Sequence, residues 1–151
     1  MKNIVLTFAI LLALPGCAVI KAQQSTNDQV TYLTSGSSNL PFSEAVKVGN
    51  TLYLSGQIGL VPGTGQLAHG GIKAESKQTM DNIVRVLNKY DYNIDDVVKC
   101  AVMLTDIKEW PTFNEVYKPY FKNHFPARSA FAASGLALNA KVEVECIAVK
   151  Q

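Results

Sequence analysis

In the C-terminal half of the chain, segments with helical spacing of apolar residues are followed by segments with strand spacing. This order of segments constrains the fold more than any other feature. The pattern predicts, in order, a helix over 74–90, a strand over 97–104, a helix over 109–124, and strands over 128–133 and 141–149. Pro119 lies inside the second helical pattern, where it predicts a kink or an early end. Helices that each bury one stripe need a sheet to pack against.

A predicted β-hairpin precedes this region. Residues 45–48 and 51–55 are strand-type runs on either side of Gly49-Asn50, and glycine supplies the positive φ that such a turn requires. Residues 30–34 alternate weakly and lead into a connector rich in serine and glycine. A hairpin followed by strand, helix and strand patterns predicts the α+β class: a mixed β-sheet with two helices packed on one face.

The last strand pattern predicts what the other face of this sheet carries. Glu143 and Glu145 project to one face, whereas Val142, Val144 and Cys146 project to the other. A chain of this length has no further layer to cover the face that bears the carboxylates. We therefore expect a partner subunit and a polar site on that face.

The composition is that of one ordinary globular domain. The 151 residues include 14 Lys+Arg and 12 Asp+Glu, which gives a net charge of +2, and 48% of the residues are hydrophobic. These values argue against disorder. The sequence also lacks a basic stripe, so no nucleic-acid partner is expected.

The N-terminal segment reads as an export signal. Residues 1–16 combine an early lysine with an apolar run too short to span a bilayer, which predicts a signal peptide of the lipoprotein type. Leu14-Pro15-Gly16-Cys17 resembles a lipobox, so Cys17 is the predicted lipidation site and mature N-terminus. Residues 17–29 form a predicted tether and 30–151 the domain. The protein is then expected to be exported, periplasmic and anchored to the membrane by lipid; the alternative is a soluble periplasmic protein cleaved near Ala22.

Three cysteines are too few for a disulfide scaffold. Cys100 and Cys146 lie in predicted strands, where small buried apolar residues are the default interpretation. An exported chain also allows a disulfide between them, provided that their strands are neighbours and their side chains share a face. The sequence leaves both alternatives open.

Two charged side chains stand out as candidates for chemistry. Arg128 begins a predicted strand, where a guanidinium offers a planar fork that holds a carboxylate through two hydrogen bonds. Glu145 lies between apolar residues, so it must face a cation, a water-filled cleft or solvent, and it could orient or deprotonate a water. The simpler alternative is an internal ion pair between Arg128 and Glu143 or Glu145.

Other kinds of site find little support in the sequence. His69 and His124 have no further metal ligand at close spacing, so no metal site is expected. Ser55 is followed by Gly-Gln and has no histidine placed to activate it, which argues against a serine nucleophile.

Several short motifs resemble the RidA (YjgF) family of reactive-intermediate deaminases, in the order and with the spacing of that family. They cover essentially residues 30–150, and the Pro-Ala-Arg-Ser string followed by the Glu-x-Glu strand is the most specific part. The motifs are Leu54-Ser55-Gly56-Gln57-Ile58, Thr79-Met80-Asp81-Asn82-Ile83, Phe113-Asn114-Glu115-Val116-Tyr117, Phe125-Pro126-Ala127-Arg128-Ser129 and Val142-Glu143-Val144-Glu145-Cys146-Ile147-Ala148.

The resemblance implies a chorismate-mutase-like fold, a homotrimer with clefts between subunits, and hydrolysis of 2-imino acids and enamines to 2-keto acids and ammonia without a cofactor. By position, Arg128 would clamp the substrate carboxylate and Glu145 would position the attacking water. The residues implied to line the cleft are Ser55, Gly56, Asn114 and Phe42.

Two positions depart from the family pattern. Phe42 stands where many active deaminases carry a tyrosine, and Ala130 stands where many carry a cysteine. The first change removes a hydroxyl from the cleft.

Two hypotheses follow from the resemblance and the export signal. The first is an imine deaminase acting on imino acids that are formed outside the cytoplasm. The second is a non-catalytic binder of small carboxylates that uses the same Arg128. Glu145 favours the first, because binding alone needs no acid to position water, whereas Phe42 and export favour the second.

Overall fold

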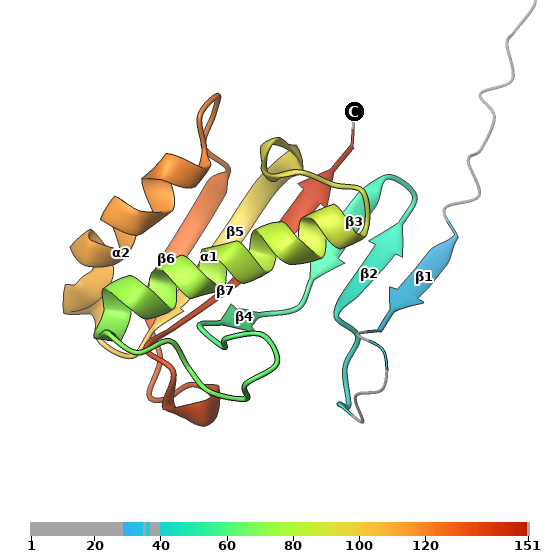
Figure 1. Cartoon of the computed structure of the whole chain (residues 1–151). Helices are drawn as coiled ribbons and strands as arrows, with labels where there is room; N and C mark the ends of the chain where they lie inside the picture. The colour runs from blue at the N-terminus through green and yellow to red at the C-terminus, as the bar shows by residue number, and fades with distance from the viewer. Residues whose placement is uncertain (1–28, 35, 37–39, 151) are drawn as a thin grey trace, which may run out of the picture.

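A computed structural model describes residues 29–34, 36 and 40–150 of the chain (Figure 1). The predicted signal peptide, Cys17 and the predicted tether as far as residue 28 lie outside the described residues. In the described part, no helix has the length and apolar character needed to cross a membrane.

The domain is built on one mixed sheet, in which the strand order is β1-β2-β3-β7-β5-β6 and β4 pairs with β7. All neighbouring strands are antiparallel except β5 and β6, which run parallel. Figure 1 shows helices α1 and α2 lying across the same face of this sheet. The predicted architecture is thus confirmed. The strands are β1 (Val30–Leu33), β2 (Ala45–Val48), β3 (Thr51–Leu54), β4 (Gln57–Ile58), β5 (Val97–Leu104), β6 (Ala127–Ala132) and β7 (Val142–Val149).

The predicted hairpin is formed by β2 and β3. Gly49 has a φ of 57° between the two strands, which is the left-handed conformation that the turn demands. The sequence missed the short strand β4, which pairs with Val144 and Glu143 of β7. A strand of two residues has no detectable alternation, so only its pairing reveals it.

Helix α1 (Gly71–Lys89) begins three residues before the predicted start, and its buried face carries Met80, Ile83 and Leu87 as expected. Helix α2 (Trp110–Tyr117) ends well before His124. The chain continues as the 3-10 helix η3 (Lys118–Tyr120), because Pro119 has no N–H to donate to a further α-helical bond. The early end was predicted, but the stated bound of residue 124 was wrong. The other 3-10 helices are η1 (Ile94–Asp96), η2 (Ile107–Glu109) and η4 (Ala137–Asn139).

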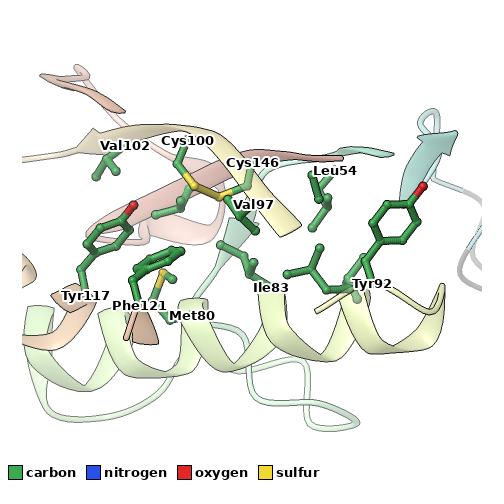
Figure 2. Packing of buried hydrophobic residues seen from close by; sticks show 14 of the residues in the cluster. Leu54, Met80, Ile83, Tyr92, Val97, Cys100, Val102, Tyr117, Phe121 and Cys146 are labelled. Carbon is green, nitrogen blue, oxygen red and sulfur yellow. A yellow bond between two sulfur atoms is a disulfide. The ribbon is translucent and has the colours of Figure 1, made fainter. Parts of the chain in front are cut away.

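The core lies between the helices and the sheet, and it contains a disulfide. Cys100 of β5 and Cys146 of β7 are register partners, they point to the helices, and they are bonded to each other (Figure 2). Of the two alternatives left open by the sequence, the structure has the disulfide. Both conditions for it are met, because the strands are neighbours and the side chains share a face.

The opposite face of the sheet, here called the open face, is not covered by any layer that residues 29–34, 36 and 40–150 form. It presents Tyr32, Tyr53 and Phe131, each with about half or more of its surface exposed, beside Glu143 and Glu145. Valines 142 and 144 of the same strand are fully buried on the helix side, so the predicted alternation along β7 is confirmed. These exposed aromatic side chains are the observation on the open face that a partner surface would account for.

Candidate functional site

Arg128 lies on the helix side of the sheet, not on the open face. It is the register partner of Cys100 in the parallel β5–β6 pair, and Cys100 points into the core. Glu145 and Glu143 lie on the open face, two strands away in β7. The internal ion pair considered from the sequence is therefore wrong, since the sheet separates the opposite charges.

Helix α2 holds the Arg128 guanidinium in place. Nη2 donates a hydrogen bond to Asn114 Oδ1 over 2.7 Å. The guanidinium carbon lies 4.6 Å from the ring centroid of Tyr117, with Phe113 and Trp110 at 5.8 and 6.0 Å. These α2 residues share one helix face because their spacing of three, four and seven matches the helical turn. Cation–π attraction and one hydrogen bond thus fix the cation without neutralising it.

Tyr117 supports Arg128 as a neutral side chain. Burial raises the pKa of its phenol to about 12, although the nearby Arg128 charge lowers it. The hydroxyl is buried and has no hydrogen-bond partner among the described residues. The ring therefore stays uncharged at ordinary pH and presents its face to the cation.

A cleft of about 350 Å³ opens beside the guanidinium. No acidic residue lines it, and within residues 29–34, 36 and 40–150 Arg128 takes part in no ion pair. The strand edge leaves Arg128 only partly buried, so its remaining N–H groups are available to an incoming anion. We call this site the arginine cleft; its lining residues are Asn114, Tyr117, Lys118, Phe125, Pro126 and Arg128.

The two carboxylates of β7 differ in environment. Glu145 is exposed, whereas Glu143 is partly buried. Burial raises the pKa of Glu143, and the charge of Glu145 two residues away raises it further. The surroundings of Glu143 thus favour its protonated form, whereas the sequence alone offered this residue only as a possible ion-pair partner of Arg128. The Glu-x-Glu pattern placed both residues on one face, but only tertiary packing buries one of them.

Ser55 and Gly56 lie next to Glu143. The Glu143 carboxylate lies directly against Gly56, where a Cβ would overlap it, so any larger residue here would displace that carboxylate. Ser55 Oγ donates to the backbone oxygen of Ser43 over 2.7 Å, which holds the segment carrying Phe42 beside the end of β3. The Phe42 ring is exposed. We call this second group the carboxylate face; it comprises Phe42, Ser55, Gly56, Glu143 and Glu145.

The residues singled out in the sequence therefore form two separate groups in one chain. Arg128 and Asn114 meet in the arginine cleft, and Ser55, Gly56 and Phe42 gather near Glu143. No contact within the described part of the chain brings the two groups together. Across the described ranges, no set of histidine, cysteine and acidic residues is arranged to hold a metal ion.

Comparison with known proteins identifies a family and named relatives for this chain. The family model described as "Endoribonuclease L-PSP" matches residues 34–150. The human protein named 2-iminobutanoate/2-iminopropanoate deaminase is 43% identical over 110 residues, which are 73% of this chain and 80% of the human one. The bovine protein of the same name is 44% identical with the same coverage.

Solved structures agree with the fold. A putative endoribonuclease L-PSP from Entamoeba histolytica superposes with a TM-score of 0.75 at 41% identity, covering 81% of this chain and all of the other. RidA from the Antarctic bacterium Psychrobacter gives 0.72 at 35% identity, covering 79% of this chain and 94% of its own.

Proposed function

The chain belongs to the endoribonuclease L-PSP family, also called the RidA (YjgF) family, and from that premise we propose that it is a deaminase of reactive 2-imino acids. The reaction adds water to the C=N bond of a 2-imino acid and yields a 2-keto acid and ammonia. Because the imine carbon is already electrophilic, the protein has to orient the substrate, hold a water and move protons. None of these steps calls for a cofactor.

The unpaired guanidinium of Arg128 is the observation that carries this proposal. A 2-imino acid has a planar carboxylate, which a guanidinium binds through parallel hydrogen bonds. Asn114 occupies one N–H of Arg128 and fixes the plane of the group. In our proposal Arg128 clamps the carboxylate, and the orientation of that clamp sets where the imine carbon lies.

We assign the attacking water to Glu143, with Glu145 as its neighbour. A general base works best when its pKa lies near the working pH, and the raised pKa of Glu143 moves it in that direction. The Glu143 carboxylate takes a proton from water as the oxygen adds to the imine carbon. The protonated Glu143 then returns the proton to the nitrogen, which gives a tetrahedral carbinolamine. Glu143 next takes the proton of the carbinolamine hydroxyl and passes it to the nitrogen, so that the C=O bond forms as the C–N bond breaks and ammonia leaves. This assignment differs from the expectation of Glu145, which is more exposed.

We further propose that the site is completed between copies of the chain in a homotrimer. The arginine cleft and the carboxylate face lie on opposite sides of one sheet, so a single chain cannot bring both to one substrate. The open face, with its aromatic side chains, is suited to pack against another copy. Closed symmetry would then bring the arginine cleft of one copy to the carboxylate face of the next.

Ribonuclease activity, which the names of some relatives suggest, finds little support in this chain. The net charge is only +2, and nucleic-acid binding depends on a basic surface that neutralises phosphates. A carboxylate clamp, combined with an acid from a neighbouring copy as proposed above, suits a small imino acid better.

The test is complementation between two inactive variants. Arg128→Ala should reduce keto-acid release from oxidase-generated imines by about 100-fold or more, since a charged clamp contributes binding and orientation. Glu143→Gln should also be inactive. Co-expression of the two variants should restore about a quarter of the wild-type rate, because each site needs one intact residue from each of two copies.

Several controls separate the outcomes. Arg85→Ala removes the other arginine of the chain, on the exposed side of α1, and should leave the rate unchanged. If co-expression restores nothing, the assembly between copies is wrong. If the wild-type protein releases no keto acid but still binds pyruvate through Arg128, the non-catalytic binder is the correct account.

We also propose export, with Cys17 as the lipidated N-terminus and the periplasm as the location. The Cys100–Cys146 disulfide supports this proposal, because disulfides persist in oxidising compartments and are rare in the cytosol. The substrates would then be imino acids formed by oxidation of amino acids outside the cytoplasm.

A further inference from the structure

A ladder of aromatic rings runs from the core to the mouth of the arginine cleft. Ring centroids are 5.4 Å apart for Phe113 and Tyr117, 4.7 Å for Tyr117 and Phe121, and 6.3 Å for Phe121 and Phe125. Figure 2 shows Tyr117 and Phe121 packed side by side under the sheet. Tilted rings at these distances attract one another beyond the area they bury. The ladder therefore forms a rigid apolar wall.

Phe125 is the exposed end of this wall. The three inner rings are buried, whereas 62% of the Phe125 surface is accessible, and the residue lines the arginine cleft. Its backbone is restricted because Pro126 follows it, and Pro126 is itself buried. Phe125 thus presents an exposed aromatic ring, in contact with Phe121, only three residues before the Arg128 clamp.

The deaminase proposal leaves this surface without a role. A carboxylate bound to Arg128 takes up one end of the cleft, and the rest of its roughly 350 Å³ extends along Phe125 and Pro126. A volume of that order accommodates ligands much larger than an imino acid with a methyl side chain. An exposed, pre-ordered aromatic ring gains contact area with a bound apolar group at little entropic cost.

We infer that the arginine cleft selects 2-imino acids with aromatic or bulky apolar side chains, which lie against Phe125 while Arg128 holds the carboxylate. This inference rests on the proposed deaminase function and names its substrate class. Phe125 is then a specificity-determining residue. Lys118 also lines the cleft, so preference for a second carboxylate is the competing outcome that the test must separate.

The experiment compares three imines made in place by an amino-acid oxidase from phenylalanine, alanine and glutamate. The protein is purified after expression of the full chain, and keto-acid release is measured above the spontaneous rate. We expect kcat/KM for the phenylalanine-derived imine to exceed that for the alanine-derived imine by about tenfold or more. Phe125→Ala should remove most of this ratio, chiefly by lowering kcat/KM for the phenylalanine-derived imine.

Matched variants guard against a misfolded protein. Phe125→Leu keeps an apolar contact with Phe121 and should give an intermediate ratio. Ile107→Ala removes an exposed apolar side chain of η2 outside the cleft and should leave the ratio unchanged. Binding of phenylpyruvate and of pyruvate, followed by calorimetry, should show the same preference and the same loss in Phe125→Ala.

Each result decides between the inference and the function on which it rests. Equal rates for phenylalanine- and alanine-derived imines, or a faster glutamate-derived imine, would overturn the inference and leave the deaminase intact. Hydrolysis of none of the three would overturn the deaminase. The calorimetric comparison would then still decide whether the cleft prefers an aromatic carboxylate, and equal binding of the two keto acids would sink the inference as well.

Discussion

The arginine cleft and the carboxylate face differ in how completely one chain builds them. In the cleft, a single helix supplies a hydrogen bond and three aromatic rings to one cation. On the carboxylate face, two acids of the same strand repel each other and no cation is bonded to either in the described residues. One chain thus positions the cation through its own contacts, whereas it leaves the two acids without a neutralising partner among the described residues.

Separation of the two groups by the sheet prevents an ion pair between them within one chain. If Arg128 and the glutamates shared a face, they would form the internal ion pair that the sequence allows, and the clamp would be neutralised before substrate arrived. Placing them on opposite faces keeps both charges available. Assembly of copies can then bring them to one substrate.

The largest effect is expected when each carboxylate is removed separately, which tests whether the carboxylate face acts in catalysis and the arginine cleft in binding. Glu143→Gln should lower kcat by about 100-fold to 10,000-fold, because a positioned general base contributes that much, while product binding through Arg128 persists. Glu145→Gln should change kcat by only about a few-fold. Steady-state kinetics with product binding measured in parallel checks this. A large loss in Glu145→Gln with an active Glu143→Gln would return the role to Glu145.

A second prediction concerns the disulfide, which lies between the strands that carry the two groups. The disulfide joins β5, which borders the strand of Arg128, to β7, which carries the glutamates. Its cysteines are 46 residues apart, and in the chain-entropy model a loop of that length contributes about 4 kcal/mol to stability. Cys100→Ala with Cys146→Ala should therefore lower the denaturant midpoint and Tm of the protein strongly.

The two alanines remove side-chain volume as well as the disulfide, so a control must separate these effects. Reduction of the wild-type protein breaks the disulfide without leaving a cavity. Unfolding wild-type protein with and without dithiothreitol should reproduce most of the loss, and the double variant should not respond to dithiothreitol. Protein recovered from the cell envelope should show no free thiol at either cysteine. Free thiols in that fraction would contradict both the disulfide and the proposed oxidising location.

The smallest expected effect concerns the stability of the carboxylate face itself. The pKa of Glu143 is raised in the folded protein, so between its ordinary value and its folded value the native state binds more protons than the unfolded state. Stability is then lost as pH rises through this window. Glu143→Gln removes the ionised group, and its Tm should exceed that of the wild type slightly at neutral pH.

The pH dependence gives this prediction its control. Below the ordinary carboxyl pKa, Glu143 is protonated in both states, so the two proteins should unfold at the same temperature. A variant that is inactive yet more stable would fit a functional carboxylate held at a cost to the fold. A lower Tm at neutral pH would instead mean that Glu143 stabilises the free chain.

The sequence alone determined the longer helices and strands and the faces within each of them, but not the two-residue strand β4. Alternation along 141–149 set Glu143 and Glu145 apart from Val142, Val144 and Cys146, because successive side chains in a strand must point to opposite sides. Helical spacing located the buried stripe of α1, and Pro119 fixed the early end of α2. These are local rules, and local residues satisfy them.

Tertiary structure decided the register of each strand against its neighbour, and so which face of the sheet each side chain points to. The side that Arg128 faces depends on the parallel pairing of β6 with β5, and the disulfide depends on the register of β5 with β7. Both pairings join residues that are far apart in the chain, and a shift of one residue in either would move every side chain of that strand to the other face. The periodicity of a single strand cannot fix that phase. Only the packing of the whole sheet against α1 and α2 places the cation on one side and the two acids on the other.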